Sequence, residues 1–437
     1  MSRTRLIVLL GGFALLVALV PVVVHHAATR QRGTLDAAPH LVLAATAGRS
    51  AVTPAMRAEI QRVVADAPRL PTVARKLVAA MRPAVTGTGG KPLAQTQAVD
   101  QTVAPMVAQS LAQSLVRCAT FDGQRYCLGE GWTQQTPAQV RSSIVGAMGQ
   151  QAGPQTGDLS PLQAMLRQAA LSPSARAAAE SAELTQAAQS VAKVWLLRHQ
   201  LQGVPLPKDF LQQHPEAAVP AGSTTTAGSA TGSGAMALSA ATTRARRAAY
   251  PTSYKILSPK RVSAQQRTYW CGVASMQMIG WNWSHHKRTQ RHWAGRLRTT
   301  TDGTATSDMV RVINQDTGWG NKWHAGPYIV LDVRHWTYTQ WWRLIEKHIS
   351  KYHAPVVLNP MLLKKYFPYL DHDESGHFQV GRGYKRRYKS YNLIGYFEPF
   401  NQQQFDPSEP YIARVQWRSA YRSYLANEAN SLHEIGV

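Results

Sequence analysis

The segment QQRTYWCGVASMQMIGW, residues 265–281, decides the fold of the C-terminal half of this chain. It places Cys271 directly before a run of small and apolar residues, which favours a helix that begins at the cysteine. Unpaired backbone N–H groups and the helix dipole stabilise an anion at such a position. We therefore expect Cys271 to carry a thiol with a lowered pKa, because the thiolate is the nucleophilic form.

Among the histidines that follow, His377 has the sequence context that a catalytic base requires. It comes after Gly376 and begins the alternating strand pattern HFQV, in which His377 and Gln379 face the same side. A histidine held on a strand can pair with a thiolate and later protonate a leaving amine. His285, His286 and His292 lie in a basic, Trp-rich stretch and are expected to be surface or packing residues.

A third residue should orient the imidazole of the base. Glu398 ends the strand-like segment YFEPF, and Asp406 in FDP is the alternative. Gln265, six residues before the cysteine, can donate a hydrogen bond to the oxyanion of a tetrahedral intermediate. Trp270 is the candidate for a wall of the cleft. Cysteine, histidine and acid in this order predict thiol hydrolysis of a peptide or amide bond.

Residues 263–399 resemble the bacteriocin-processing (double-glycine leader) peptidase family, in its stand-alone, secreted, papain-like branch found in bacteria. The resemblance rests on Gln265 and YWCG, then on ASMQMIGW, TTTDGTATSDMVRVIN, SGHFQVGRGY and YFEP. It implies a nucleophile, a base, an acid and an oxyanion-hole donor at Cys271, His377, Glu398 and Gln265. Two positions depart from the family pattern. Val273 stands where a proline usually follows Cys-Gly, and Glu398 replaces the usual Asp or Asn.

The fold expected for residues 250–437 is an α+β papain-like peptidase domain, in which the helix of Cys271 packs on an antiparallel sheet that carries His377. Short β-branched or aromatic runs bounded by Gly, Pro or Asn predict the strands. These runs are PYIVLDV, APVVLNPML, HFQVGRGY and YNLIGYF. The segment WWRLIEKHISKYH predicts a helix between them.

Upstream, residues 53–215 predict a small, separate helical domain in which we find no catalytic motif. Helices are expected to start at Pro54 and Pro71, and a third to run from Pro173 to Gln200. Cys118 and Cys127 enclose a short polar loop and are expected to form a disulfide. Residues 216–249 are rich in Ala, Gly, Ser and Thr, which is typical of a flexible linker.

The N-terminus predicts export from the cytoplasm. Arg3 and Arg5 precede an apolar run from Leu6 to Val24, so residues 1–28 are expected to be a signal peptide or an uncleaved membrane anchor, followed by a tail over residues 29–52. The bulk of the chain is then extracellular or anchored to the outer face of the cell membrane, where a cysteine pair is oxidised.

The composition limits the partners. The 437-residue chain has a formal net charge of +24, which suits an acidic cell-wall polymer or an anionic membrane surface as well as a peptide substrate. No zinc-finger, RNA-binding or helix-turn-helix pattern is present, so we expect no nucleic-acid partner. We expect no cofactor and no metal site. Two alternatives to a peptidase remain: another acyl-transfer enzyme acting on cell-wall peptide, and an inactive binding domain of the same fold.

Overall fold

The fold is built around strands from both halves of the chain. The structure is a computed structural model that describes residues 43–66, 105–147, 156–218, 250–387, 391–400, 402–405 and 407–437. The predicted export segment 1–28, the helix expected at Pro71, Asp406 and most of the predicted linker lie outside the described residues. Residues Leu41–Val437 form one unit.

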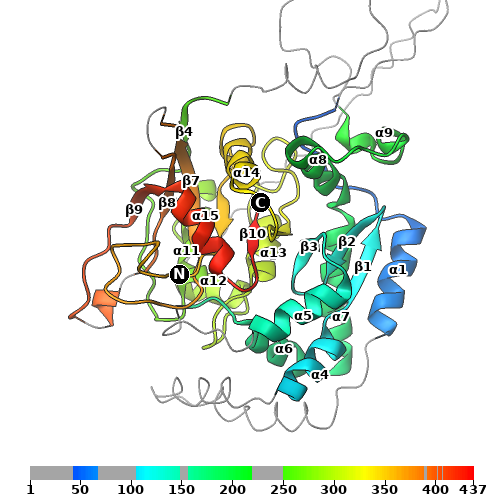
Figure 1. Ribbon diagram of the computed structural model, residues 1–437, viewed down its shortest axis with the longest axis horizontal. Coiled ribbons are helices and arrows are strands. Elements are labelled where there is room, and N and C mark those ends of the chain that lie inside the picture. Colours follow the sequence, from blue (N-terminus) through cyan, green and yellow to red (C-terminus); the bar gives the residue numbers. More distant parts are fainter. Residues whose placement is uncertain are drawn as a thin grey trace, which may run out of the picture. The chain divides into compact units, whose positions relative to one another are not determined.

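Ten strands of the described part of the chain form one sheet (Figure 1). Its order is β1-β2-β3-β5-β10-β6-β7-β8-β9, and β4 pairs with β7 outside this path. The strands are β1 (Cys118–Phe121), β2 (Gln124–Cys127), β3 (Gly131–Thr133), β4 (Ser253–Lys255), β5 (Val330–Asp332), β6 (Val356–Leu358), β7 (Gln379–Lys385), β8 (Leu393–Phe397), β9 (Val415–Ser419) and β10 (Glu434–Gly436). All neighbours are antiparallel except β3 and β5, which are parallel.

The four strands predicted for the C-terminal half are confirmed as β5, β6, β7 and β8. Their residues are almost all buried, as expected for strands covered on both faces. The strand next to the chain's C-terminus, β10, enters the middle of the sheet between β5 and β6. The mixed α+β class expected from the sequence is confirmed.

The helices pack against this sheet and against one another. They are α1 (Pro54–Ala65), α4 (Pro105–Leu115), α5 (Pro137–Ala147), α6 (Pro161–Ala169), α7 (Pro173–Ala188), α8 (Val191–Gln202), α9 (Phe210–Gln213), α11 (Cys271–Ser284), α12 (Gln290–Arg296), α13 (Thr306–Asp316), α14 (Tyr338–Ser350) and α15 (Ala420–Ala429). Two short 3-10 helices are η1 (Pro215–Ala217) and η2 (Gln402–Gln404). In Figure 1, α1 flanks β1, and α14 lies over the part of the sheet that holds β7.

The predicted helix from Pro173 to Gln200 is in fact two helices, α7 and α8. The break lies at Ser190, whose φ of −113° and ψ of 3° are not helical. The Ser190 hydroxyl donates to the carbonyl oxygen of Ala187 (2.8 Å) and accepts from the Trp132 indole (3.2 Å). A serine hydroxyl that bonds to the backbone competes with helix continuation, which propensity alone does not register.

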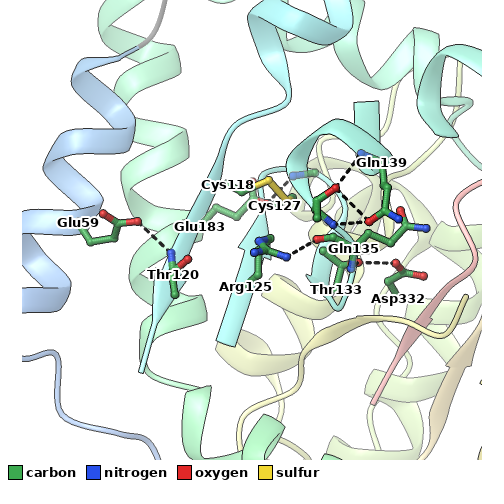
Figure 2. Close-up of a disulfide and its surroundings, with 12 residues drawn as sticks. Glu59, Cys118, Thr120, Arg125, Cys127, Thr133, Gln135, Gln139, Glu183 and Asp332 are labelled. Carbon is green, nitrogen blue, oxygen red and sulfur yellow. Dashed lines mark hydrogen bonds between the residues drawn. A yellow bond between two sulfur atoms is a disulfide. The ribbon is translucent and has the colours of Figure 1, made fainter. Parts of the chain in front are cut away.

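The structure does not confirm a separate helical domain upstream. Strand β3 pairs with β5 at Trp132 and Leu331, so both halves of the chain share one sheet. The Thr133 hydroxyl also donates to the Asp332 carboxylate across this boundary at 2.7 Å (Figure 2). Because Trp132 is buried against core residues of both halves, the upstream residues share one hydrophobic core with the C-terminal half.

The predicted disulfide is confirmed. Cys118 and Cys127 are joined and face each other across the β1–β2 hairpin (Figure 2). Figure 2 also shows Thr120 of β1, whose amide donates to the Glu59 carboxylate of α1 at 2.9 Å. The bridge therefore closes a hairpin that is tied to its neighbouring helix. Among the described helices, none combines the length and apolar character that crossing a membrane requires.

A close contact between two helices positions α11. A side chain at Gly280 of α11 would meet the Trp293 ring of α12, because a Cβ atom there would lie 2.4 Å from its nearest carbon. Glycine at this position lets α12 approach the helix that begins at Cys271. By contrast, a Cβ atom at Gly295 of α12 would have no neighbour within 4 Å.

These two glycines give a matched test of the packing. We expect Gly280→Ala to lower the free energy of unfolding by about 1–3 kcal/mol through overpacking. Gly295→Ala should instead raise it by up to about 0.5–1 kcal/mol, because alanine is the better helix former. Urea unfolding of both variants measures the difference. Equal stability of the two variants would contradict the contact between Gly280 and Trp293.

Candidate active site

Cys271 is the first residue of α11, as the sequence predicts, and its side chain is fully buried. The helix packs on β7 through small residues near its start. The Ser275 hydroxyl donates to the Phe378 carbonyl at 3.2 Å, and a Cβ atom at Gly272 would meet the Phe378 ring at 3.1 Å. This close packing brings the thiol beside the residue that follows His377.

The prediction of a lowered pKa for this thiol is wrong in the structure described here. Burial raises the pKa of Cys271 well above its usual value, and the nearby Asp158 carboxyl acts in the same direction. The backbone N–H groups of Phe378 and Gly272 oppose this rise without overcoming it. A helix start favours a thiolate only where solvent or a cation compensates for burial.

His377 lies just before β7, and its side chain is also fully buried. Its Nε2 atom lies 2.7 Å from the Glu398 carboxylate, and its Nδ1 atom has no hydrogen-bond partner among the described residues. The backbone holds the residue in place, because its N–H donates to the Pro360 carbonyl at 2.9 Å. The ring therefore has one nitrogen on an acid and one nitrogen available.

Glu398 follows β8 and has a full set of partners. Besides His377, its carboxylate accepts from the Gln379 amide (2.7 Å), the Tyr369 hydroxyl (2.8 Å) and the Phe400 N–H (2.9 Å). Burial acts to raise the pKa of Glu398, but the charge and hydrogen bond of His377, with the Phe400 and Tyr369 bonds, bring it below its usual value. The carboxylate is therefore the stable form. The two donors Gln379 and Tyr369 were not identified as site residues from the sequence.

Gln265 lies beside this pair, since its N–H donates to the Pro399 carbonyl at 2.8 Å. Its side-chain amide donates to the backbone carbonyls of Arg267 (3.1 Å) and Thr268 (2.7 Å). Both amide hydrogens are thereby engaged, so in this arrangement Gln265 closes a turn and does not present a donor to an oxyanion. Its role in the reaction stays a prediction.

Trp270 occupies the N-cap position of α11 and is half-buried. Its ring meets that of Tyr269 edge to face, with 6.3 Å between ring centroids, and the Arg267 guanidinium lies 4.9 Å from the Trp270 ring. Trp270 thus precedes Cys271 in the chain and packs partly against the hydrophobic core. Its role as a wall of the cleft stays a prediction.

One part of the site comes from a segment in which the sequence indicates no chemistry. Residues Thr156–Leu159, upstream of α6, lie against the start of α11. A Cβ atom at Gly157 would be 3.0 Å from the Cys271 sulfur and 2.6 Å from the Tyr269 carbonyl group. No local pattern marks this segment, since its partners lie more than 100 residues away in the chain.

One group of described side chains has the spacing of a metal site. Ligand atoms of Asp371, His372 and Glu409 lie within 4.8 Å of one another. Asp371 and His372 are about half exposed and pair with each other at 2.7 Å. Imidazole and carboxylates at a surface commonly pair in this way, and the group contacts none of the residues of the His377–Glu398 pair by any described hydrogen bond. Within the described part of the chain, this group is therefore described apart from the candidate site.

Comparison with known families agrees with this geometry. Residues 259–424 match the model of the Peptidase_C39 like family, which covers the cysteine, the histidine and the glutamate described above. The match supports a C39-like cysteine peptidase, whose substrate is a peptide or protein. No curated protein and no solved structure matches the chain.

The burial of Cys271 leads to a prediction about its reactivity. We expect iodoacetamide to label the intact, folded chain slowly at neutral pH and to accelerate only in the alkaline range, above the value of about 8.5 for a free thiol. The reason is that burial raises the pKa of the thiol and limits access to it. The rate of mass gain as a function of pH measures this, with Cys271→Ser as the unlabelled control. Rapid labelling of the intact chain at mildly acidic pH would contradict it.

Proposed function

From the match of residues 259–424 to a C39-like cysteine peptidase family, we propose that this chain hydrolyses peptide bonds with Cys271 as nucleophile and His377 as base. The observation that carries the proposal is the buried His377–Glu398 contact of 2.7 Å, which leaves the second imidazole nitrogen without a hydrogen-bond partner among the described residues. The start of α11 packs on Phe378, the residue that follows His377. Nucleophile, base and orienting acid in this order form the set that acyl transfer needs.

In the proposed reaction, the imidazole Nδ1 takes the thiol proton and the Cys271 sulfur attacks the scissile carbonyl carbon. The C–N bond then breaks as the imidazolium gives its proton to the leaving amine, which leaves a thioester on Cys271. Water, activated by the same imidazole, hydrolyses the thioester. Glu398 keeps the ring oriented and stabilises its positive charge throughout.

The tetrahedral intermediate carries a negative oxygen that needs hydrogen-bond donors. The backbone N–H of Cys271 at the start of α11 is the first donor that we propose. Gln265 is the second, after its amide turns away from the carbonyl oxygens of Arg267 and Thr268. Its backbone bond to Pro399 supports this role, because it holds the residue near the acid.

We further propose that the enzyme works outside the cytoplasm, or anchored to the outer face of the membrane. The apolar run from Leu6 to Val24, the net charge of +24 and the disulfide between Cys118 and Cys127 support this location. The positive charge also suits acidic cell-wall polymer or an anionic membrane surface near the substrate.

Turnover of a fluorogenic peptide mixture by the intact chain tests the activity. We expect Cys271→Ser and His377→Ala to lower kcat/KM by about 1000-fold or more, and Glu398→Gln by at least about 100-fold. His292→Ala, outside the site, is the matched control and should keep the wild-type rate. Equal rates for wild type and Cys271→Ser would refute the proposal. Turnover of muropeptides or isopeptides without cleavage of plain peptides would indicate another acyl transfer.

Tyr369 tests how the acid is held. Tyr369→Phe removes a single donor to Glu398, so we expect kcat to fall about 3–10-fold with KM unchanged. Because the hydroxyl helps to lower the pKa of Glu398, its loss should raise that pKa. Activity lost on acidification would then be lost at a higher pH. Tyr411→Phe, at a tyrosine that is 69% exposed, is the control. An unchanged pH profile would limit Tyr369 to a structural role.

A further inference from the structure

Residues 156–159 pack against the Cys271 side chain and the neighbouring Tyr269 backbone. They approach the cysteine more closely than a side chain would allow, because a Cβ atom at Gly157 would be 3.0 Å from the sulfur. The backbone at Gly157 has a φ of +121°, a conformation that other residues rarely adopt. The thiol has no exposed surface in this arrangement.

One edge of the segment is bound as an added strand would be. The Thr304 N–H donates to the Gly157 carbonyl at 2.9 Å, and the Leu159 N–H donates to the Thr304 carbonyl at 3.1 Å. Asp158 and Thr304 form a parallel bridge. Main-chain pairing of this kind is how clefts commonly bind extended peptides, because it needs no particular side chain.

The opposite edge contacts the residues just before the histidine. The Thr156 N–H donates to the Ser375 hydroxyl at 2.9 Å, and the Thr156 hydroxyl donates to the Gly376 carbonyl at 2.6 Å. The segment is thus bound on both sides, between the loop at Thr304 and the chain that leads into His377. The segment therefore contacts both the chain that carries the proposed nucleophile and the chain that leads into the proposed base.

Asp158 fixes the segment further. Its carboxyl group accepts from the Asn430 amide at 3.1 Å and, with the Asn359 amide turned toward it, from Asn359 at 3.1 Å. Burial raises the pKa of Asp158 to about 7. Helix α6 follows directly, and its Arg167 pairs with Asp308 of α13 at 2.7 Å.

The Gly157 carbonyl group bears on whether this segment could itself be cleaved. Its carbonyl oxygen is already bonded to the Thr304 N–H, and no described hydrogen bond joins it to the backbone amides that start α11. Hydrolysis needs the carbonyl oxygen in the position of the oxyanion donors. A peptide held in this way closes the site without being poised for cleavage.

We propose that Thr156–Leu159 is a built-in occupant of the substrate cleft, which keeps Cys271 closed until the upstream part of the chain moves away. This inference rests on the proposed function only in calling the covered space a substrate cleft. Whether the segment covers the Cys271 thiol can be measured without any peptidase activity. Displacing the segment exposes the thiol, and it also opens the path for a peptide.

Alkylation of Cys271 by iodoacetamide at pH 8 tests the closure without requiring catalysis. Gly157→Ala places a methyl group against Tyr269 and Cys271 in an unfavourable backbone conformation. We expect it to raise the labelling rate by about tenfold or more, because strain at such a position shifts the opening equilibrium by at least that factor. Gly203→Ala is the matched control, since Gly203 also has a positive φ, of +76°, but has nothing within 4 Å. Its labelling rate should equal that of wild type.

A second variant covers the case in which Gly157→Ala does not fold. Arg167→Ala removes the ion pair with Asp308 and should raise the labelling rate about 3–10-fold by loosening α6. Arg296→Ala breaks a comparable pair with Asp316, within the C-terminal half, and should leave the rate unchanged.

The outcomes separate this inference from the proposed function. Faster labelling of Gly157→Ala supports closure even if no peptide is hydrolysed. Peptide hydrolysis by wild type, with equal labelling rates in wild type, folded Gly157→Ala and Arg167→Ala, overturns closure and leaves the peptidase proposal intact. Intact mass of the purified chain adds a further check. A cut after Gly157 in wild type, absent in Cys271→Ser, would show that the segment is a substrate and would overturn the inhibitor proposal.

Discussion

The contact between His377 and Glu398 is the constraint on which the rest of the site depends. Both side chains are fully buried, and a carboxylate without water is costly unless every lone pair has a donor. Tyr369, Gln379 and the Phe400 N–H supply those donors. The acid is therefore held from three directions, and the imidazole that it orients has a fixed place.

Backbone hydrogen bonds also hold the acid and connect it to the segment before α11. The Glu398 N–H donates to the Arg414 carbonyl, and the neighbouring Pro399 carbonyl accepts from Gln265. The segment that leads into α11 is thus attached to the same end of β8 as the acid. Through the packing of Gly272 and Ser275 on Phe378, the start of the helix reaches the histidine. The short chain of contacts explains how residues more than 100 positions apart converge at one site.

Local patterns were sufficient for part of this arrangement. The small-residue run after Cys271 predicts the helix start, and the alternation at HFQV predicts that His377 and Gln379 share a face, as their common contact with Glu398 shows. The shared sheet of the two halves was not predictable, because β3 and β5 pair through Trp132 and Leu331, which lie 199 residues apart by number. Propensity likewise does not indicate the break at Ser190, where the hydroxyl bonds to the Ala187 carbonyl and accepts from the distant Trp132.

The pKa of Cys271 is a second property that local sequence patterns could not predict. A helix start and nearby backbone N–H groups act to lower it, and that part can be read from sequence. Burial acts to raise it and is the larger effect here. Gly157, which packs against the sulfur, belongs to a segment with no recognisable motif of its own.

Glycine at three distant positions makes this burial possible. A Cβ atom at Gly157 would meet Tyr269 and the Cys271 sulfur, one at Gly303 would meet the Gly157 carbonyl at 2.4 Å, and one at Gly376 would meet the Asp158 carboxylate at 2.4 Å. Each glycine alone reads as an ordinary loop residue. Together they let three chain segments approach within backbone contact around one thiol. Cys271 has no exposed surface in this arrangement, so under the proposed closure one of the three segments moves before the chemistry can begin. Of the three, the segment at Gly376 leads into His377, and the segment at Gly303 lies between α12 and α13 of the C-terminal half. Residues 156–159 come from the upstream half, and their displacement leaves the cysteine, the histidine and the glutamate in place.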